Sequence, residues 1–115
     1  MRNLRDFYEK SGVDYDALVQ RMMGKEALVE KYLGIFIADT TYSELERAMD
    51  LQDYEAVGFK AHTLKGIALN LNFEKLGTLC TSIVSSVRSG DTAELEPQFE
   101  QVKAEYTCII KDLGN

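Results

Sequence analysis

The chain has 115 residues, of which 45% are hydrophobic and 28% are charged, and its formal net charge at pH 7 is −6. This length allows one hydrophobic core, and the acidic balance argues against nucleic-acid binding, which normally needs a basic surface. No apolar run approaches the roughly 20 residues that span a bilayer, and the first six residues lack the apolar core of a signal peptide. We therefore expect a cytoplasmic protein with no membrane partner.

Two short helices are expected within residues 1–24. The first covers residues 3–10. The second covers residues 15–23, where Asp14 is a suitable N-cap and Gly24 a suitable left-handed terminator. Helices of this length persist only when they pack against a larger body.

A long helix is predicted over residues 25–51. Helical spacing is kept there by Leu28, Tyr32, Ile35, Tyr42, Leu45 and Met49. Its apolar face is widened in the first half by Val29, Leu33, Phe36 and Ile37. The β-branched pair Thr40-Thr41 is the point where this helix is expected to bend.

Three further helices are predicted, over residues 53–72, 74–89 and about 96–113. Asp53 is the candidate N-cap of the first, and Asn72 suits the left-handed turn that follows it. Their core-facing positions are spaced by three and four residues. These positions are Val57, Ala61, Leu64, Ala68 and Leu71, then Leu76, Leu79 or Cys80, Ile83 and Val87, and finally Leu95, Phe99, Val102, Tyr106, Ile109 and Leu113.

Short connections make consecutive helices antiparallel neighbours. The sequence therefore predicts an all-α single domain over residues 1–115, built as an up-down-up-down four-helix bundle (25–113) preceded by one or two short helices. Cys80 and Cys108 are far apart and show no metal-ligand spacing, so we expect buried free thiols and no metal site.

The only histidine, His62, lies in the middle of the helix predicted over residues 53–72. At ~100° per residue its side chain points roughly 140° away from the centre of the apolar stripe, and so faces outward. Lys65 follows one turn later, and Gly58 and Gly66 stand four residues before and after it. Since a mid-helix glycine costs about 1 kcal/mol relative to alanine, this pair predicts that a bulky partner approaches the imidazole.

Phosphoryl chemistry is available to this arrangement. An exposed unprotonated imidazole is a nucleophile near neutral pH, and Lys65 can place an ammonium against phosphate oxygens. Phe59 and Leu69 project on the same outward sector, either as a docking surface or as a cover for the short N-terminal helix. Small hydroxyls on the next helix are candidate phosphate or docking contacts, or ordinary surface groups: Thr81, Ser82 and Ser85.

The run His62-Thr63-Leu64-Lys65-Gly66, followed by Ala68, Asn70-Leu71 and Leu76, resembles the signature of histidine-containing phosphotransfer (HPt) domains. The likeness extends over roughly residues 12–113. Such domains are four-helix bundles that relay phosphoryl groups between the receiver domains of hybrid sensor kinases and response regulators in two-component phosphorelays.

This resemblance implies a role for each residue of the motif. His62 would be the phosphoacceptor, through its Nε2 atom, Lys65 would stabilise the phosphoryl group, and Gly66 would give steric access. It also implies a phosphocarrier without kinase activity of its own, which needs no cofactor because the partner receiver supplies the Mg²⁺. Many members place a long polar residue on the next helix facing the histidine, where this chain has Val84.

We expect a monomer, because pairing through the face of His62 would block the receivers. Two other hypotheses remain open: a helical interaction module that docks receiver or kinase domains without carrying phosphate, and a purely structural bundle. The last predicts that His62→Ala leaves function intact. An enzyme is not favoured, because no second histidine exists and the Glu-x-x-His motif of di-metal bundles is absent.

Overall fold

The computed structural model describes residues 3–114, so residues 1, 2 and 115 of the predicted domain lie outside the described part. Within it the regular structure is entirely helical, which confirms the predicted all-α class. The elements in chain order are α1 (Leu4–Glu9), α2 (Tyr15–Arg21), α3 (Glu26–Ala38), α4 (Thr41–Asp50), α5 (Tyr54–Asn70), α6 (Glu74–Ser89), the 3₁₀ turn η1 (Thr92–Glu94) and α7 (Leu95–Gly114).

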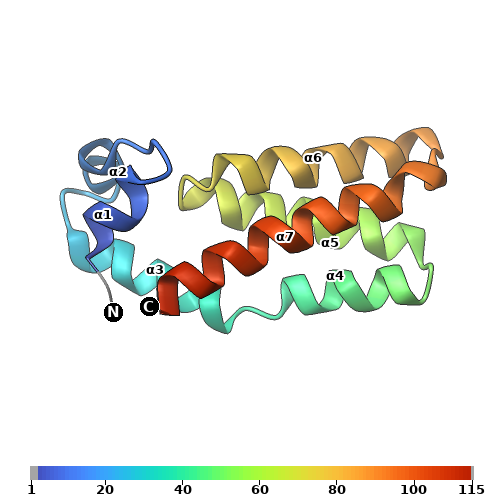
Figure 1. Ribbon diagram of the computed structural model, residues 1–115, viewed down its shortest axis with the longest axis horizontal. Helices are drawn as coiled ribbons and strands as arrows, with labels where there is room; N and C mark the ends of the chain where they lie inside the picture. The colour runs from blue at the N-terminus through green and yellow to red at the C-terminus, as the bar shows by residue number, and fades with distance from the viewer. Residues whose placement is uncertain (1–2, 115) are drawn as a thin grey trace.

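Helices α4, α5, α6 and α7 lie side by side and alternate in direction, as predicted for an up-down-up-down bundle (Figure 1). The molecule is elongated along the bundle axis and measures 42 × 23 × 20 Å. Tyr42 of α4 stacks on Tyr106 of α7 with the ring centroids 4.0 Å apart. This contact joins α4 and α7, which are the first and last helices of the bundle, and so closes the bundle.

The prediction of one helix over residues 25–51 is wrong. The chain leaves the helical conformation at Asp39, whose backbone is extended, and a new helix begins at Thr41. The carboxylate of Asp39 accepts a hydrogen bond from the Thr41 amide at 2.7 Å, and the Thr40 hydroxyl donates to Glu44 at 2.8 Å. These local side-chain bonds compete with the helical ladder, so the expected bend is a complete break.

The first half of that segment buries only one side of the wide apolar face that was predicted for it. Val29, Leu33 and Phe36 are buried, whereas Ile35 is 51% exposed and Ile37 is 45% exposed. Both sets of residues have helical spacing. Contact with the end of the bundle buries the set that contains Val29, Leu33 and Phe36. The core positions predicted for α5 and α7 are all buried except Tyr106, which is half-buried.

The two short N-terminal helices are confirmed, with bounds one or two residues tighter than expected. The Asp14 carboxylate accepts a hydrogen bond from the Ala17 amide at 3.1 Å, as predicted for the N-cap of α2. With the start of α3, they cover the end of the bundle where α5 turns into α6 (Figure 1). Five rings fill this junction, and we call them the aromatic cap: Phe7, Tyr8, Tyr15, Phe36 and Phe73.

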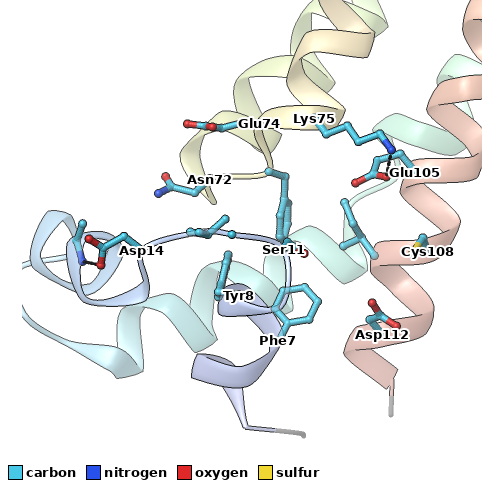
Figure 2. A pocket seen from close by; sticks show the side chains of 15 residues that line it. Phe7, Tyr8, Ser11, Asp14, Asn72, Glu74, Lys75, Glu105, Cys108 and Asp112 are labelled. Atoms are coloured by element: carbon cyan, nitrogen blue, oxygen red, sulfur yellow. Dashed lines mark hydrogen bonds and ion pairs between the residues drawn. The ribbon is translucent and has the colours of Figure 1, made fainter.

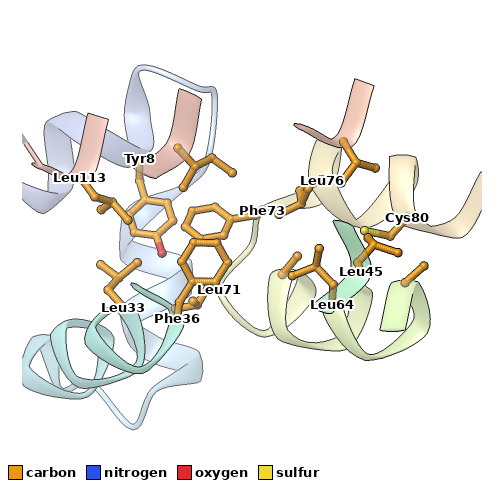
Figure 3. Packing of buried hydrophobic residues seen from close by; sticks show 14 of the residues in the cluster. Tyr8, Leu33, Phe36, Leu45, Leu64, Leu71, Phe73, Leu76, Cys80 and Leu113 are labelled. Carbon is orange, nitrogen blue, oxygen red and sulfur yellow. The ribbon is translucent and has the colours of Figure 1, made fainter. Parts of the chain in front are cut away.

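Phe73, which lies between α5 and α6, is the centre of the aromatic cap (Figure 3). Its ring centroid is 5.2 Å from that of Phe36 and 5.8 Å from that of Tyr8. Tyr8 is 1% exposed, and its burial raises the pKa of the phenol above the ordinary value. Phe73 thus links α1 and α3 to the α5–α6 turn.

The cysteine prediction is half right. Both thiols are free, and Cys80 is buried in the bundle, but Cys108 is exposed on α7. Cys108 precedes the buried Ile109 on the helix and is itself exposed. Within residues 3–114, no group of three or more His, Cys, Asp or Glu side chains is arranged to hold a metal ion.

Candidate functional site

Helix α5 is positioned by a cap at one end and a left-handed turn at the other. The Ala56 amide donates to the Asp53 carboxylate at 3.2 Å, which confirms the predicted N-cap. At the other end, Asn72 adopts a φ of +60°, a conformation that asparagine tolerates better than most residues. Between these points the core stripe of α5 is at most 1% exposed. His62 lies opposite this stripe and is exposed, as the spacing predicted.

The surface beside His62 is formed by close contact between α5 and α6. A Cβ atom added to Gly58 would lie 3.0 Å from Cγ1 of Val87, and one added to Gly77 would lie 2.6 Å from Cδ2 of Leu69. The two contacts define an antiparallel register in which His62 stands level with Ile83 and Val84. Val84 is half-buried there, so the position of α6 that is level with His62 carries an aliphatic side chain.

The two lysines near His62 have different surroundings. Lys65, one turn after His62, forms no ion pair within the described residues, so its ammonium is available to an anion. Lys60 is instead bonded to the Glu44 carboxylate of α4 at 2.7 Å, and its Nζ lies 5.6 Å from the centroid of the Phe59 ring. The hydrogen bond from Lys60 lowers the pKa of Glu44.

The two glycines that flank His62 also differ. Gly66 is exposed, and a Cβ at this position would meet no atom within 4 Å. Gly58 faces α6, where Val87 limits the space. Close helix packing therefore accounts for Gly58, while Gly66 leaves open surface one turn beyond the imidazole.

The apolar residues proposed for docking are both accessible. Phe59 is 68% exposed and Leu69 is 43% exposed. An exposure of 68% leaves Phe59 without the covering role considered from the sequence. Its side chain therefore adds apolar surface beside His62, of the kind found at protein interfaces.

The hydroxyls on α6 are directed into their own helix. The Thr81 hydroxyl donates to the Gly77 carbonyl at 2.9 Å, and that of Ser82 donates to the Thr78 carbonyl at 3.4 Å. Ser85 is exposed, whereas its neighbour Ser86 is buried. Unlike the hydroxyls of Thr81 and Ser82, that of Ser85 forms no hydrogen bond within residues 3–114.

A contact that the sequence does not reveal fixes the end of α5. The Arg21 guanidinium of α2 donates to the Asn70 carbonyl at 2.7 Å and to the side-chain oxygen of Asn72 at 2.5 Å. These residues are about fifty positions apart, and no local pattern links them. Arg21 therefore ties the N-terminal helices to the helix that carries His62.

The fold and the site together are those of a four-helix bundle with an exposed imidazole at the middle of one helix and, one turn away, a lysine that has no ion pair within residues 3–114. Comparison with protein families agrees: the sequence model described as Hpt domain matches residues 32–110. The match covers more than half of the chain and includes His62, so the chain belongs to the Hpt domain family, whose members act in histidine phosphotransfer. Comparison with curated proteins and with solved structures gave no significant match.

The family model matches fewer residues than the likeness noted in the sequence, which extends over roughly residues 12–113. The match begins within α3 and ends within α7, so α1 and α2 lie outside it.

The length and polarity of a helix decide whether it can cross a membrane. None of the helices in residues 3–114 is both long and apolar enough to do so.

Proposed function

We propose that His62 accepts a phosphoryl group from the aspartyl phosphate of one receiver domain and passes it to the aspartate of another. In the first step the Nε2 lone pair attacks phosphorus, the bond from phosphorus to the aspartate oxygen breaks, and the carboxylate leaves. The second step is the reverse reaction on a different receiver. Each receiver brings the Mg²⁺, and this chain acts as a phosphocarrier with no kinase activity of its own.

The proposal is supported by three features that occur together on α5. The one histidine of the chain is exposed at mid-helix, an ammonium without an ion pair within residues 3–114 lies one turn away, and the helix surface at Gly66 is open. Lys65 would neutralise charge on the phosphoryl oxygens, and Gly66 would admit the active-site loops of the receiver. Phe59, Leu69 and Ser85 would surround this point as docking contacts.

The test is phosphoryl transfer from a pre-phosphorylated receiver domain in the presence of Mg²⁺. Wild-type protein should acquire a label that is stable in base and labile in acid, as phosphohistidine is, and His62→Gln should acquire none. Lys65→Gln should slow transfer, whereas Lys60→Gln is the matched control, because that lysine is already bonded to Glu44. Equal labelling of His62→Gln and wild type would exclude His62 as acceptor.

The exposed Phe59 favours one second candidate, a module that binds receiver or kinase domains without carrying phosphate. The same experiment separates the two functions if binding is measured in parallel. Receivers that bind the wild-type chain and never transfer to it would support the docking module. The proposal also includes a monomeric, cytoplasmic protein, which sedimentation and fractionation would test.

A further inference from the structure

A cavity lies away from His62, between the N-terminal helices and the bundle. This cavity has a volume of about 480 Å³, within the range of small-molecule sites. One wall is the α1–α2 loop, another is the α5–α6 turn, and the third is the last part of α7 (Figure 2). Asn72, on its wall, follows His62 by ten residues, which is ~15 Å along a helix.

The floor of the cavity is apolar and aromatic. It is formed by Phe7 and Tyr8 of α1, Phe73 of the α5–α6 turn and Ile109 of α7. The rings of Phe7 and Phe73 meet edge to face, with an interplanar angle of 90° and centroids 6.1 Å apart. The four side chains are at most 8% exposed, so they offer a small apolar surface to the non-polar part of a ligand.

The rim of the cavity carries an excess of negative charge. Its lining includes one ammonium, that of Lys75, and four carboxylates: Asp14, Glu74, Glu105 and Asp112. Figure 2 shows these acidic side chains on different sides of the opening, contributed by the α1–α2 loop, α6 and α7.

Two of these carboxylates are matched by lysines. Glu105 is paired with Lys75 at 3.6 Å, and Asp112 with Lys10 at 3.2 Å. Asp14 and Glu74 form no ion pair within residues 3–114, so two negative charges at the rim are not compensated by a neighbouring lysine or arginine.

From this combination we infer that the cavity between α1, the α5–α6 turn and α7 binds a small organic cation, an ammonium ion attached to an aromatic or aliphatic group. The apolar part occupies the floor beside Phe7 and Phe73, and the ammonium lies at the rim near Asp14 and Glu74. Neutral and anionic ligands of the same shape bind less well, because they leave the rim charge uncompensated. This site is independent of phosphotransfer at His62.

All of the lining residues from α1 to α2 lie outside the segment matched by the family model, as does Asp112 of α7. The matched segment alone therefore does not form the cavity. A ligand bound in it would contact Asn72, and Arg21 joins Asn72 to α2.

The thiols of the chain offer a direct readout. Cys108 is exposed and lines the cavity, whereas Cys80 is fully buried and its burial raises the pKa of its thiol to about 12. Iodoacetamide, which is uncharged, should therefore alkylate Cys108 and spare Cys80. A ligand in the cavity should slow the alkylation of Cys108.

The probe is phenethylammonium, compared with the neutral 2-phenylethanol and the anionic 3-phenylpropionate. We expect saturating phenethylammonium to slow alkylation of Cys108 severalfold, and the other two compounds to protect much less. Added salt should weaken the protection, because it screens the rim charges. Equal protection by all three compounds, or protection by none, would overturn the inference.

Two substitutions test the contribution of the rim. Asp14→Asn keeps a good N-cap for α2 while removing the charge, and Glu74→Gln removes the other. Each should weaken binding of phenethylammonium about two- to fivefold, as expected for one partly exposed charge pair. Glu100→Gln is the matched control, since Glu100 is exposed on α7 away from the cavity and its loss should leave affinity unchanged. An equal loss in all three variants would show a general charge effect and overturn the assignment of the site.

Discussion

The surface around His62 and the end of the molecule capped by α1 and α2 are built in different ways. Around His62, α5 and α6 approach closely through glycines, at Gly58 against Val87 and at Gly77 against Leu69. At the capped end, large aromatic rings and a guanidinium bridge elements that are distant in sequence.

The family match follows the same division. It includes α5 and α6 entirely and leaves out α1 and α2. The closely packed helices hold an exposed imidazole in a fixed place, which is what transfer chemistry requires. The aromatic cap closes the end of the hydrophobic core at the α5–α6 turn. We therefore expect substitutions in the cap to alter stability, and substitutions on the outer face of α5 to alter transfer.

The largest expected effect is at the centre of the aromatic cap. Phe73→Ala should lower the free energy of unfolding by about 3–5 kcal/mol, because it removes a buried ring and leaves a cavity. The measurement is urea denaturation followed by circular dichroism. Phe59→Ala is the matched control: the ring is 68% exposed, so the change should stay within about 0.5 kcal/mol. Similar losses in both variants would contradict the division between cap and site.

The two glycines beside His62 should respond with opposite signs. Gly58→Ala places a Cβ 3.0 Å from Val87, and the overpacking cost of about 1–3 kcal/mol should exceed the helix-propensity gain of about 1 kcal/mol. Gly66→Ala meets no atom within 4 Å and should stabilise the protein by about 1 kcal/mol. Thermal denaturation of both variants measures the difference.

Transfer assays sharpen this comparison. Gly66→Ala should slow phosphoryl transfer despite its greater stability, since the added methyl group lies on the open surface beside His62. The double variant Gly58→Ala/Val87→Ala should recover part of the stability lost in Gly58→Ala, because it removes the side chain that is crowded. A Gly66→Ala protein that is more stable and transfers at the wild-type rate would remove the argument for steric access.

Cys80 lies in the interior of the bundle and Cys108 lies near its capped end, so substitutions of the two cysteines allow these regions to be compared. Burial raises the pKa of Cys80 from 9.0 to about 12, so the unfolded chain releases this proton first as pH rises. The contribution of Cys80 to stability is therefore intact below pH ~9, and it falls between pH ~9 and ~12 by at most about 1.4 kcal/mol per pH unit.

Urea denaturation of wild type and Cys80→Ala should be measured at several pH values between 8 and 10.5. The comparison separates the contribution of Cys80 from that of the tyrosines, because both proteins contain the same tyrosines. The wild-type curve should lose stability more steeply with pH than the variant. Cys108→Ala, which removes the exposed thiol, should have the wild-type slope. Parallel slopes for wild type and Cys80→Ala would mean that the Cys80 thiol ionises as easily in the folded protein as in the unfolded chain.

The smallest effect is expected where the two regions are joined. Arg21→Ala removes both hydrogen bonds to the end of α5 and should cost about 1 kcal/mol. Amide hydrogen exchange should accelerate in the last turn of α5 and in α2, while the amides around His62 keep their protection. Arg47→Ala, at an exposed arginine of α4, provides the comparison. Uniform acceleration along α5 would show that Arg21 supports the whole helix.

Local patterns in the sequence account for most of the fold. The bounds of α6 were predicted to the residue, because a left-handed turn at Asn72 precedes the helix and Gly90, which is also left-handed, ends it. The stripe of α5 and its caps at Asp53 and Asn72 were also predicted, since each depends on residues within one or two turns. The outward orientation of His62 follows from the same periodicity.

Other features needed the assembled molecule. Leu28, Tyr32 and Ile35 share one spacing with the predicted core, while Val29, Leu33 and Phe36 share another, and a single helix offers both faces equally. Only the packing of α3 against the rest of the molecule buries the second set and leaves Ile35 exposed. The break at Asp39 was predicted only as a bend at Thr40-Thr41, because the sequence does not show whether side-chain hydrogen bonds will replace the helical ladder.

The sequence by itself determined the helical class, the place of His62 on the outer face of its helix and the lysine beside it, because helix periodicity depends on neighbours along the chain. Only the tertiary structure showed that Gly58 is crowded while Gly66 is open, that Lys60 has an ion pair while Lys65 has none within residues 3–114, and that Cys80 is buried while Cys108 is exposed. Each pair is chemically identical, and its members differ only in what other helices place next to them. Those contacts come from packing between segments far apart in the chain, which no local pattern encodes.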